Sequence, residues 1–193
     1  DKDRLPWIWG SPTKAPVPAV ANKEWPADEI DTVILAALEE SAMAPAPPAS
    51  DRHWFRRANF AITGLPPSAD ATEEFLSNDS KDRRKNAVLA LLASPHYGER
   101  WARHWMDLVR YAESRGHESD FGIANAWRYR DYLVRAFNDD VPYNDFVAEH
   151  LAGDLLASPR LDPETTANES ILGTGWPFLG EEVHSPVDIR QDE

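Results

Sequence analysis

The densest group of chemically capable side chains lies between residues 97 and 111. On a helix, steps of four, three and four residues place the following side chains near one stripe: Arg100, His104, Asp107 and Tyr111. A histidine oriented by a carboxylate, here His104 by Asp107, can act as a general base or ligate a metal or haem. The same spacing suits a buried ion-pair network in which Arg103 and Arg110 also pair with Asp107. The sequence favours this structural interpretation, because no second ligand stands at metal spacing.

A second candidate site lies in the C-terminal run from 180 to 190, which holds several oxygen donors and one imidazole: Glu181, Glu182, His184 and Asp188. Such a set suits a divalent cation. An acidic, solvated tail explains the run about equally well. A hydrolase built on these carboxylates ranks last, because adjacent residues of an extended strand point apart.

A third candidate combines aromatic and guanidinium groups at Trp127, Arg128 and Arg130. Such a surface can stack on a sugar ring and donate hydrogen bonds to it. The competing interpretation is a helix that is buried on the side of Trp127, Leu133 and Val134. The sequence favours this second interpretation.

Composition limits what the three candidates can do. The chain has 193 residues and a formal net charge of -13, which argues against a nucleic-acid or anionic-membrane binder. It contains no Cys, which excludes disulfides, thiolate zinc sites, a Cys nucleophile and covalent haem attachment within this chain. No apolar run approaches the roughly 20 residues that span a bilayer. These observations leave a soluble acidic protein without a defined activity.

The elements that position the candidates are expected to be helices separated by Pro and Gly, because no alternating run is long enough for a sheet. The fold class is mostly α: an irregular multi-helix domain at 28–180, preceded by an extended Pro/Trp-rich arm at 1–27 and followed by a C-terminal loop at 181–193. Ser50 and Asn125 are expected to cap helices, and Gly64 to end one. The expected helices are 28–43, 51–63, a short one carrying Phe75, 81–93, 97–114, 125–138, 142–156 and 171–178.

Four ordered blocks carry a resemblance to a known family: 60–67, 92–105, 125–131 and 151–156. They resemble the planctomycete cytochrome C-like family, domain of unknown function 1549, from about Trp25 to the end of the chain. The family often has an acidic residue where Ala61 stands and Gln where His150 stands.

The resemblance implies a periplasmic or secreted, multidomain protein with a Cys-x-x-Cys-His segment that attaches haem c shortly beyond the position of Glu193. The implied function is a helical scaffold that packs around or ligates that haem, for electron transfer or oxidative polysaccharide metabolism. His184 is the first ligand candidate and His104 the second, with Asp107 and Arg190 as further cofactor-binding residues.

The expected partners are the C-terminal remainder of the same protein or a split partner chain, a cytochrome c-like redox partner and a polysaccharide. Neither a nucleic acid nor a membrane span is expected. The alternative function is a non-catalytic module that binds glycan or protein through Trp127, Arg128 and Arg130. The sequence leaves open whether the chain is an enzyme.

Overall fold

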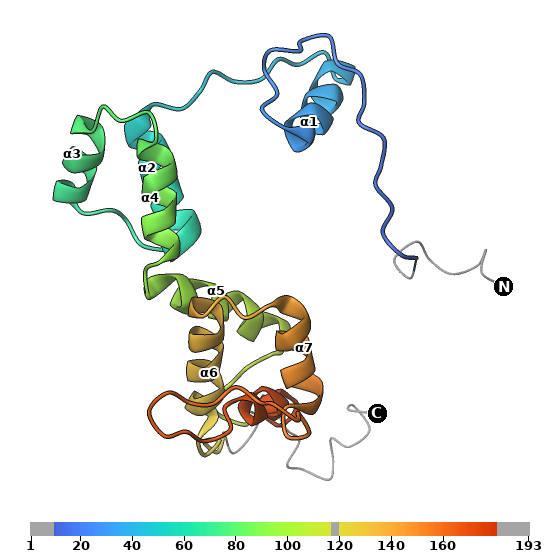
Figure 1. Ribbon diagram of the computed structural model, residues 1–193, viewed down its shortest axis with the longest axis vertical. Helices are drawn as coiled ribbons and strands as arrows, with labels where there is room; N and C mark the ends of the chain where they lie inside the picture. Colours follow the sequence, from blue (N-terminus) through green and yellow to red (C-terminus); the bar gives the residue numbers. More distant parts are fainter. Residues whose placement is uncertain (1–9, 117–119, 181–193) are drawn as a thin grey trace. The chain divides into compact units, whose positions relative to one another are not determined.

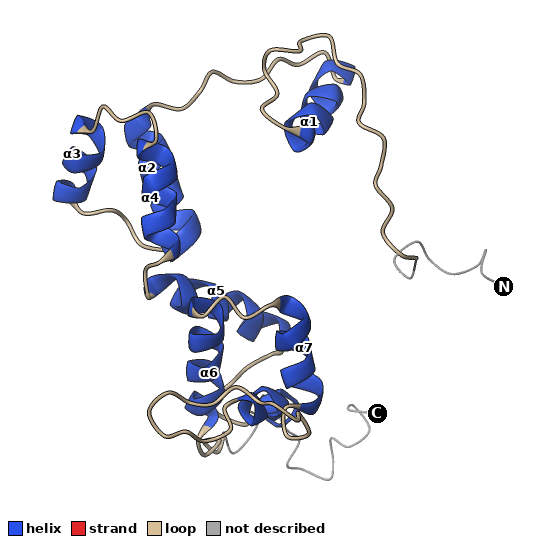
Figure 2. Ribbon diagram, in the orientation of Figure 1, coloured by secondary structure: helices blue, strands red, loops and turns tan. Residues whose placement is uncertain are grey.

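Helices are the main regular secondary structure in the part of the chain that the structure describes. This structure, a computed structural model, describes residues 10–116 and 120–180. Within them, helices are joined by loops (Figures 1 and 2), and β-pairing is limited to two isolated bridges, Ser114–Gly122 and Leu161–Asn168. The prediction of a mostly α fold is therefore confirmed. In the same residues no helix is both long and apolar enough to cross a bilayer. The chain divides into two compact units, Asp1–Ala49 and Ser50–Glu193.

In the first unit, the segment that precedes α1 (Glu29–Glu40) is tied to that helix by hydrogen bonds. The Glu39 carboxylate accepts hydrogen bonds from the backbone N–H groups of Ala21 and Asn22 at 2.9 and 3.1 Å. Asp28 caps the helix by accepting from the N–H of Asp31. The boundary between the units follows residue 49 rather than residue 27, so α1 groups with the segment that the sequence assigned to a separate arm.

The second unit begins with α2 (Asp51–Thr63), α3 (Ala69–Ser77) and α4 (Arg83–Leu92). Ser50 caps α2 through the N–H of His53, and Gly64 ends it in the left-handed conformation with φ 73°, as the sequence predicted. The α2–α3 contact is aromatic, because the ring centroids of Phe55 and Phe75 stack 4.4 Å apart.

The remaining helices are α5 (His96–Leu108), α6 (Ala126–Asn138), α7 (Tyr143–Ala152) and the 3₁₀ helix η3 (Ser170–Phe178). Their inner faces form one core cluster, whose buried members are Ala102, Tyr129, Tyr132, Leu133, Ala136 and Phe146. This cluster holds α5, α6 and α7 together and fixes the side chains that face outward from them.

Three sequence predictions for this unit are wrong. Helix α5 ends at Leu108 rather than near residue 114, because Arg110 adopts a φ of 55°. Helix α7 ends at Ala152, four residues earlier than predicted. Asn125 precedes α6 but makes no side-chain capping hydrogen bond; its backbone is left-handed, with φ 64°.

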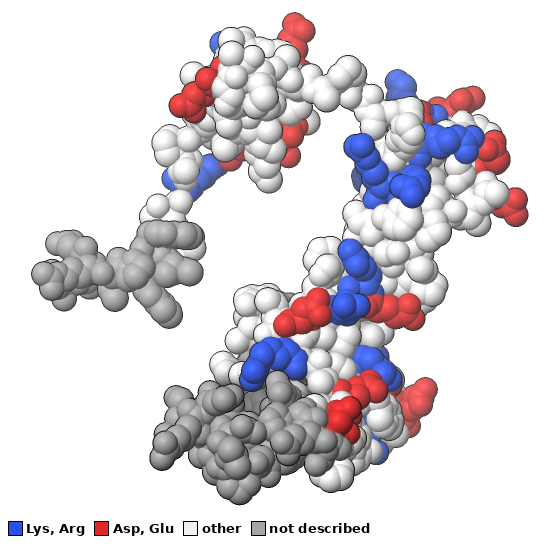
Figure 3. All heavy atoms as spheres, turned by 180° about the vertical axis from the view of Figure 1, so that it is seen from behind, with Lys and Arg blue, Asp and Glu red and all other residues white. Residues whose placement is uncertain are grey.

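The charges are unevenly distributed along the second unit. Residues 50–95 contain seven Lys and Arg against six Asp and Glu, whereas the whole chain has 20 against 33. Figure 3 shows several Lys and Arg side chains gathered over the part formed by α2, α3 and α4. The net negative charge is therefore carried by the rest of the chain.

Candidate functional site

An apolar groove of about 540 Å³ opens between α5, α6 and the start of α7. Its walls are mainly aromatic, and the lining includes Tyr97, Trp101, Trp105, Phe137, Tyr143 and Phe146. Trp101, Leu108 and Tyr143 are exposed at its edge, with exposed fractions of 38%, 74% and 72%. A contiguous apolar surface of this kind is a candidate binding site, because water solvates it poorly.

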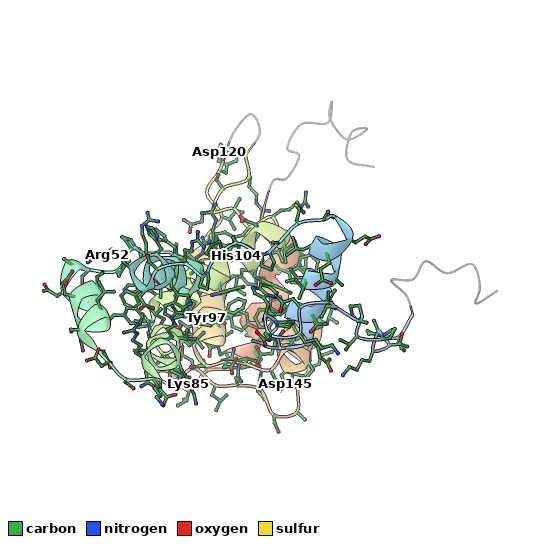
Figure 4. All side chains as sticks on the ribbon, turned by 90° about the horizontal axis from the view of Figure 1, so that it is seen from above. Arg52, Lys85, Tyr97, His104, Asp120 and Asp145 are labelled. Atoms are coloured by element: carbon green, nitrogen blue, oxygen red, sulfur yellow. The ribbon has the colours of Figure 1, made fainter. Side chains whose placement is uncertain are left out.

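Helix α5 contributes the imidazole of His104 to the lining of this groove. Figure 4 labels His104 and Tyr97, which belong to the same helix. Its imidazole is exposed, and its ring centroid lies 5.4 Å from that of Trp101. Asp107, which the sequence predicts to orient His104, accepts a hydrogen bond from Arg103 at 3.4 Å in the structure.

The stripe predicted for this helix is only partly present. Tyr111 lies beyond the end of α5, and its hydroxyl donates to Glu113 at 2.9 Å. The ion pair between Arg103 and Asp107 is exposed. The interpretation of this stripe as a buried ion-pair network is therefore wrong: Glu99, Arg103 and Asp107 of α5 are exposed, whereas Arg100 is half-buried.

A buried ion-pair network does exist, but it lies between α6, α7 and η3. Glu149, 2% exposed, accepts hydrogen bonds from Tyr132 at 2.6 Å, Ser170 at 2.7 Å and Arg160 at 2.8 Å. Arg160 also donates to Glu169 at 3.3 Å, and Glu169 accepts from Arg135 as well. These six groups therefore satisfy one another, and four of them are buried: Glu149, Glu169, Tyr132 and Ser170.

The protonation states of this network follow from its contacts. Burial disfavours the Glu149 carboxylate, but hydrogen bonds from Arg160, Tyr132 and Ser170 outweigh it and hold the pKa of Glu149 below its ordinary value. Burial and the hydrogen bond to Glu149 raise the pKa of Tyr132, which therefore remains a donor. The network is a charged, fully paired structural centre.

His150 lies beside this network and is 6% exposed. Its Nδ1 is 2.7 Å from the backbone carbonyl of Phe146, so Nδ1 carries the proton and donates it. Its Nε2 then accepts from the Trp105 indole at 3.0 Å and from the Tyr129 hydroxyl at 2.9 Å. Burial lowers the pKa of His150, and the imidazole is neutral in the folded chain.

Comparison with known proteins places the chain in a family. The sequence profile of PSCyt2, described as a protein of unknown function (DUF1549), matches residues 29–191. This chain belongs to that family.

Two further comparisons add little to the DUF1549 assignment. The chain is 30% identical over 127 residues to the membrane-bound lytic murein transglycosylase F of Marinobacter nauticus. That similarity covers 64% of this chain and 23% of the relative, so the chain spans less than a quarter of that protein's length. No solved structure matches the chain.

The aromatic and basic candidate on α6 of the DUF1549 chain is only partly available. Trp127 is 48% exposed, so the prediction that it lies on the buried side of this helix is wrong. The Arg128 guanidinium stacks over its ring at 5.5 Å. Arg130 forms ion pairs with Asp131 at 3.1 Å and Glu113 at 2.7 Å. Trp127 and Arg128 therefore share one exposed surface, whereas Arg130 is held by carboxylates.

The C-terminal candidates lie outside the described residues: Glu181, Glu182, His184, Asp188 and Arg190. Within 10–116 and 120–180, no three His, Cys, Asp or Glu side chains are grouped so that they could hold a metal ion. The haem and divalent-metal interpretations of the C-terminal run therefore remain predictions.

We expect the free energy of unfolding to fall less steeply with decreasing pH in His150→Gln than in the wild-type chain. The folded chain keeps His150 neutral, whereas the unfolded chain protonates it below its ordinary pKa of 6.5. The contribution of this residue to the free energy of unfolding is therefore complete above pH 6.5. It is lost as the pH falls from 6.5 toward the lowered pKa of the folded chain, by at most about 1.4 kcal/mol per pH unit, because one proton is involved.

Urea unfolding at a series of pH values from neutral to mildly acidic measures this effect. The same substitution at the exposed His53 provides the matched control, because the His53 side chain lies outside the core. Equal slopes for the wild-type chain and His150→Gln would contradict the assignment of a neutral buried imidazole.

Proposed function

We propose that this DUF1549 chain is the helical scaffold of a larger redox protein, in which the α5–α7 groove packs against a haem carried by another segment or by a partner chain. The observation that carries the proposal is an exposed imidazole, His104, at an apolar and aromatic groove of about 540 Å³. An aromatic wall excludes water from the face of a macrocycle, and a neutral imidazole nitrogen is a good iron ligand.

The residues of the groove fit this group in their chemistry. Trp101, Trp105 and Phe146 would hold the apolar part of the haem, and His104 would offer it an imidazole nitrogen. The chain has no cysteine, so thioether attachment would come from the other segment. When bound, the haem would supply one-electron transfer. The structural residues behind the groove keep its walls in place, because Trp105 is fixed by its hydrogen bond to His150.

Titration of the purified chain with ferric haem, followed by the Soret band, tests this proposal. We expect a saturable shift that His104→Ala weakens by about tenfold or more, and that His53→Ala, an exposed histidine on α2, leaves unchanged. The same titration of His184→Ala shows whether the shift depends on His184, the other ligand candidate from the sequence, or on His104. Absence of a saturable shift, or a shift that both exposed-histidine variants alter equally, would exclude a haem-binding groove.

A second candidate function is glycan binding by a non-catalytic module. The exposed Trp127, with Arg128 stacked over its ring, offers an apolar face and guanidinium donors next to each other. The murein transglycosylase that resembles part of this chain also acts on a glycan. Addition of neutral or murein-derived oligosaccharides should then shift the tryptophan fluorescence of the wild-type chain but not that of Trp127→Ala. An identical response of both proteins would reject this candidate.

A further inference from the structure

One face of α2 carries a concentration of cationic side chains. Arg52, Arg56 and Arg57 are all exposed, together with the imidazole of His53. At 100° per residue these four positions lie within one side of the helix. We call this set the α2 arginine face. It stands in residues 50–95, where Lys and Arg outnumber Asp and Glu by seven to six, although the whole chain is strongly acidic.

The α2 arginine face is not neutralised by its own surroundings. Arg52 pairs with Glu73 of α3 at 2.9 Å, and both side chains are exposed. The carboxylate of Asp51, which also starts this helix, is occupied by Arg83 and Arg84 of α4. Among the described residues, Arg56 and Arg57 form no ion pair. Two guanidinium groups on one turn of helix are therefore available to an external anion.

The geometry of Arg56 prepares it for such a contact. Its guanidinium lies over the Phe60 ring, 4.6 Å from the centroid, on the same side of α2. A guanidinium that is held over a ring loses less conformational freedom on binding, and its N–H groups remain available as donors. These donors match the two oxygens of a carboxylate.

We propose that the α2 arginine face is a docking surface for a carboxylate-rich patch on a partner protein. Opposite charge on two folded surfaces speeds their encounter and selects their orientation. The face is short, because α2 has 13 residues and is about 20 Å long. A long polyanion such as a nucleic acid would extend beyond it and meet the negative remainder of the chain, whereas a compact acidic patch would not.

Fluorescence anisotropy of a labelled oligoglutamate peptide, titrated with the 193-residue chain at low ionic strength, tests the proposal. We expect saturable binding that weakens by about tenfold in Arg56→Gln/Arg57→Gln and that falls as salt is added. Lys85→Gln is the matched control, since Lys85 is exposed on α4 and lies well apart from Arg52 in Figure 4. It should bind the peptide as the wild-type chain does.

Three results would overturn the proposal: no saturable binding, equal weakening by Lys85→Gln, or tighter binding of a DNA duplex than of the peptide. The single variant Arg57→Gln shows whether weaker binding comes from the lost charge rather than from misfolding. Arg57 makes no ring contact or ion pair in the described chain, so its loss should not affect folding. Thermal unfolding of every variant checks that point. The outcome is independent of the haem proposal, which concerns α5–α7.

Discussion

Replacing Glu149 by Leu should lower the free energy of unfolding by about 3–5 kcal/mol. The carboxylate is 2% exposed and is the shared acceptor of Tyr132, Arg160 and Ser170. Its removal leaves the Arg160 guanidinium with one buried carboxylate, Glu169, and leaves two hydroxyl donors without their acceptor. Urea unfolding followed by circular dichroism measures the change.

A second variant separates the loss of the charge pair from the loss of packing. In Glu149→Leu/Arg160→Met both charges are absent, so the double variant should be less destabilised than the sum of the two single variants. Glu164→Gln, an exposed carboxylate in the loop that precedes η3, serves as the control and should leave the unfolding midpoint unchanged. Strict additivity of the two single variants would show that Glu149 and Arg160 are not coupled.

Local sequence signals predicted most of the helical frame. The helix 51–63 was placed correctly at both ends, because Ser50 offers a capping oxygen and Gly64 tolerates a positive φ. Errors arose where a helix ends without such a residue. At the end of α5 a non-glycine residue, Arg110, adopts a φ of 55°, and nothing in the neighbouring sequence indicates this.

The buried network could not be predicted in the same way, because its members are far apart in the chain. Glu149 is 17 residues from Tyr132 and 21 from Ser170, so no helical spacing relates them. His150 looked unremarkable for the same reason: its partners Trp105 and Tyr129 come from two other helices. The one local signal was that a charged residue and a histidine stand together on the inner side of α7.

The candidate site on α5 was recognised by its residue types but assigned to the wrong environment. The periodicity of Trp101, Trp105 and Leu108 correctly indicated an apolar side of that helix. Part of this apolar side is left uncovered at the groove, and a pattern of apolar residues does not show whether another element covers them. For that reason His104 was expected in a buried network although it is exposed.

Replacing Gly98 by Ala should lower the free energy of unfolding by about 2–3 kcal/mol, because this glycine allows α5 to approach α6. A Cβ atom at this position would lie 2.3 Å from the backbone carbonyl oxygen of Val134 and 2.7 Å from the Asn138 side chain. The Gly98 N–H also donates to Asn138 at 2.8 Å, so separating the helices would lengthen this hydrogen bond. The better helix propensity of Ala, about 1 kcal/mol, does not compensate for contact with a rigid carbonyl.

Gly175→Ala is the matched control, because a Cβ atom at Gly175 meets no atom within 4 Å. It should unfold at the same urea concentration as the wild-type chain. Adding Asn138→Ala to Gly98→Ala relieves only the side-chain contact, and so should restore little stability if the Val134 carbonyl limits the approach. Full recovery in that double variant would mean that the helices are spaced by Asn138 alone. Tyr97 and Phe137 flank this crossing and line the groove. Displacement of the helices should therefore also lower the affinity of the groove for any ligand.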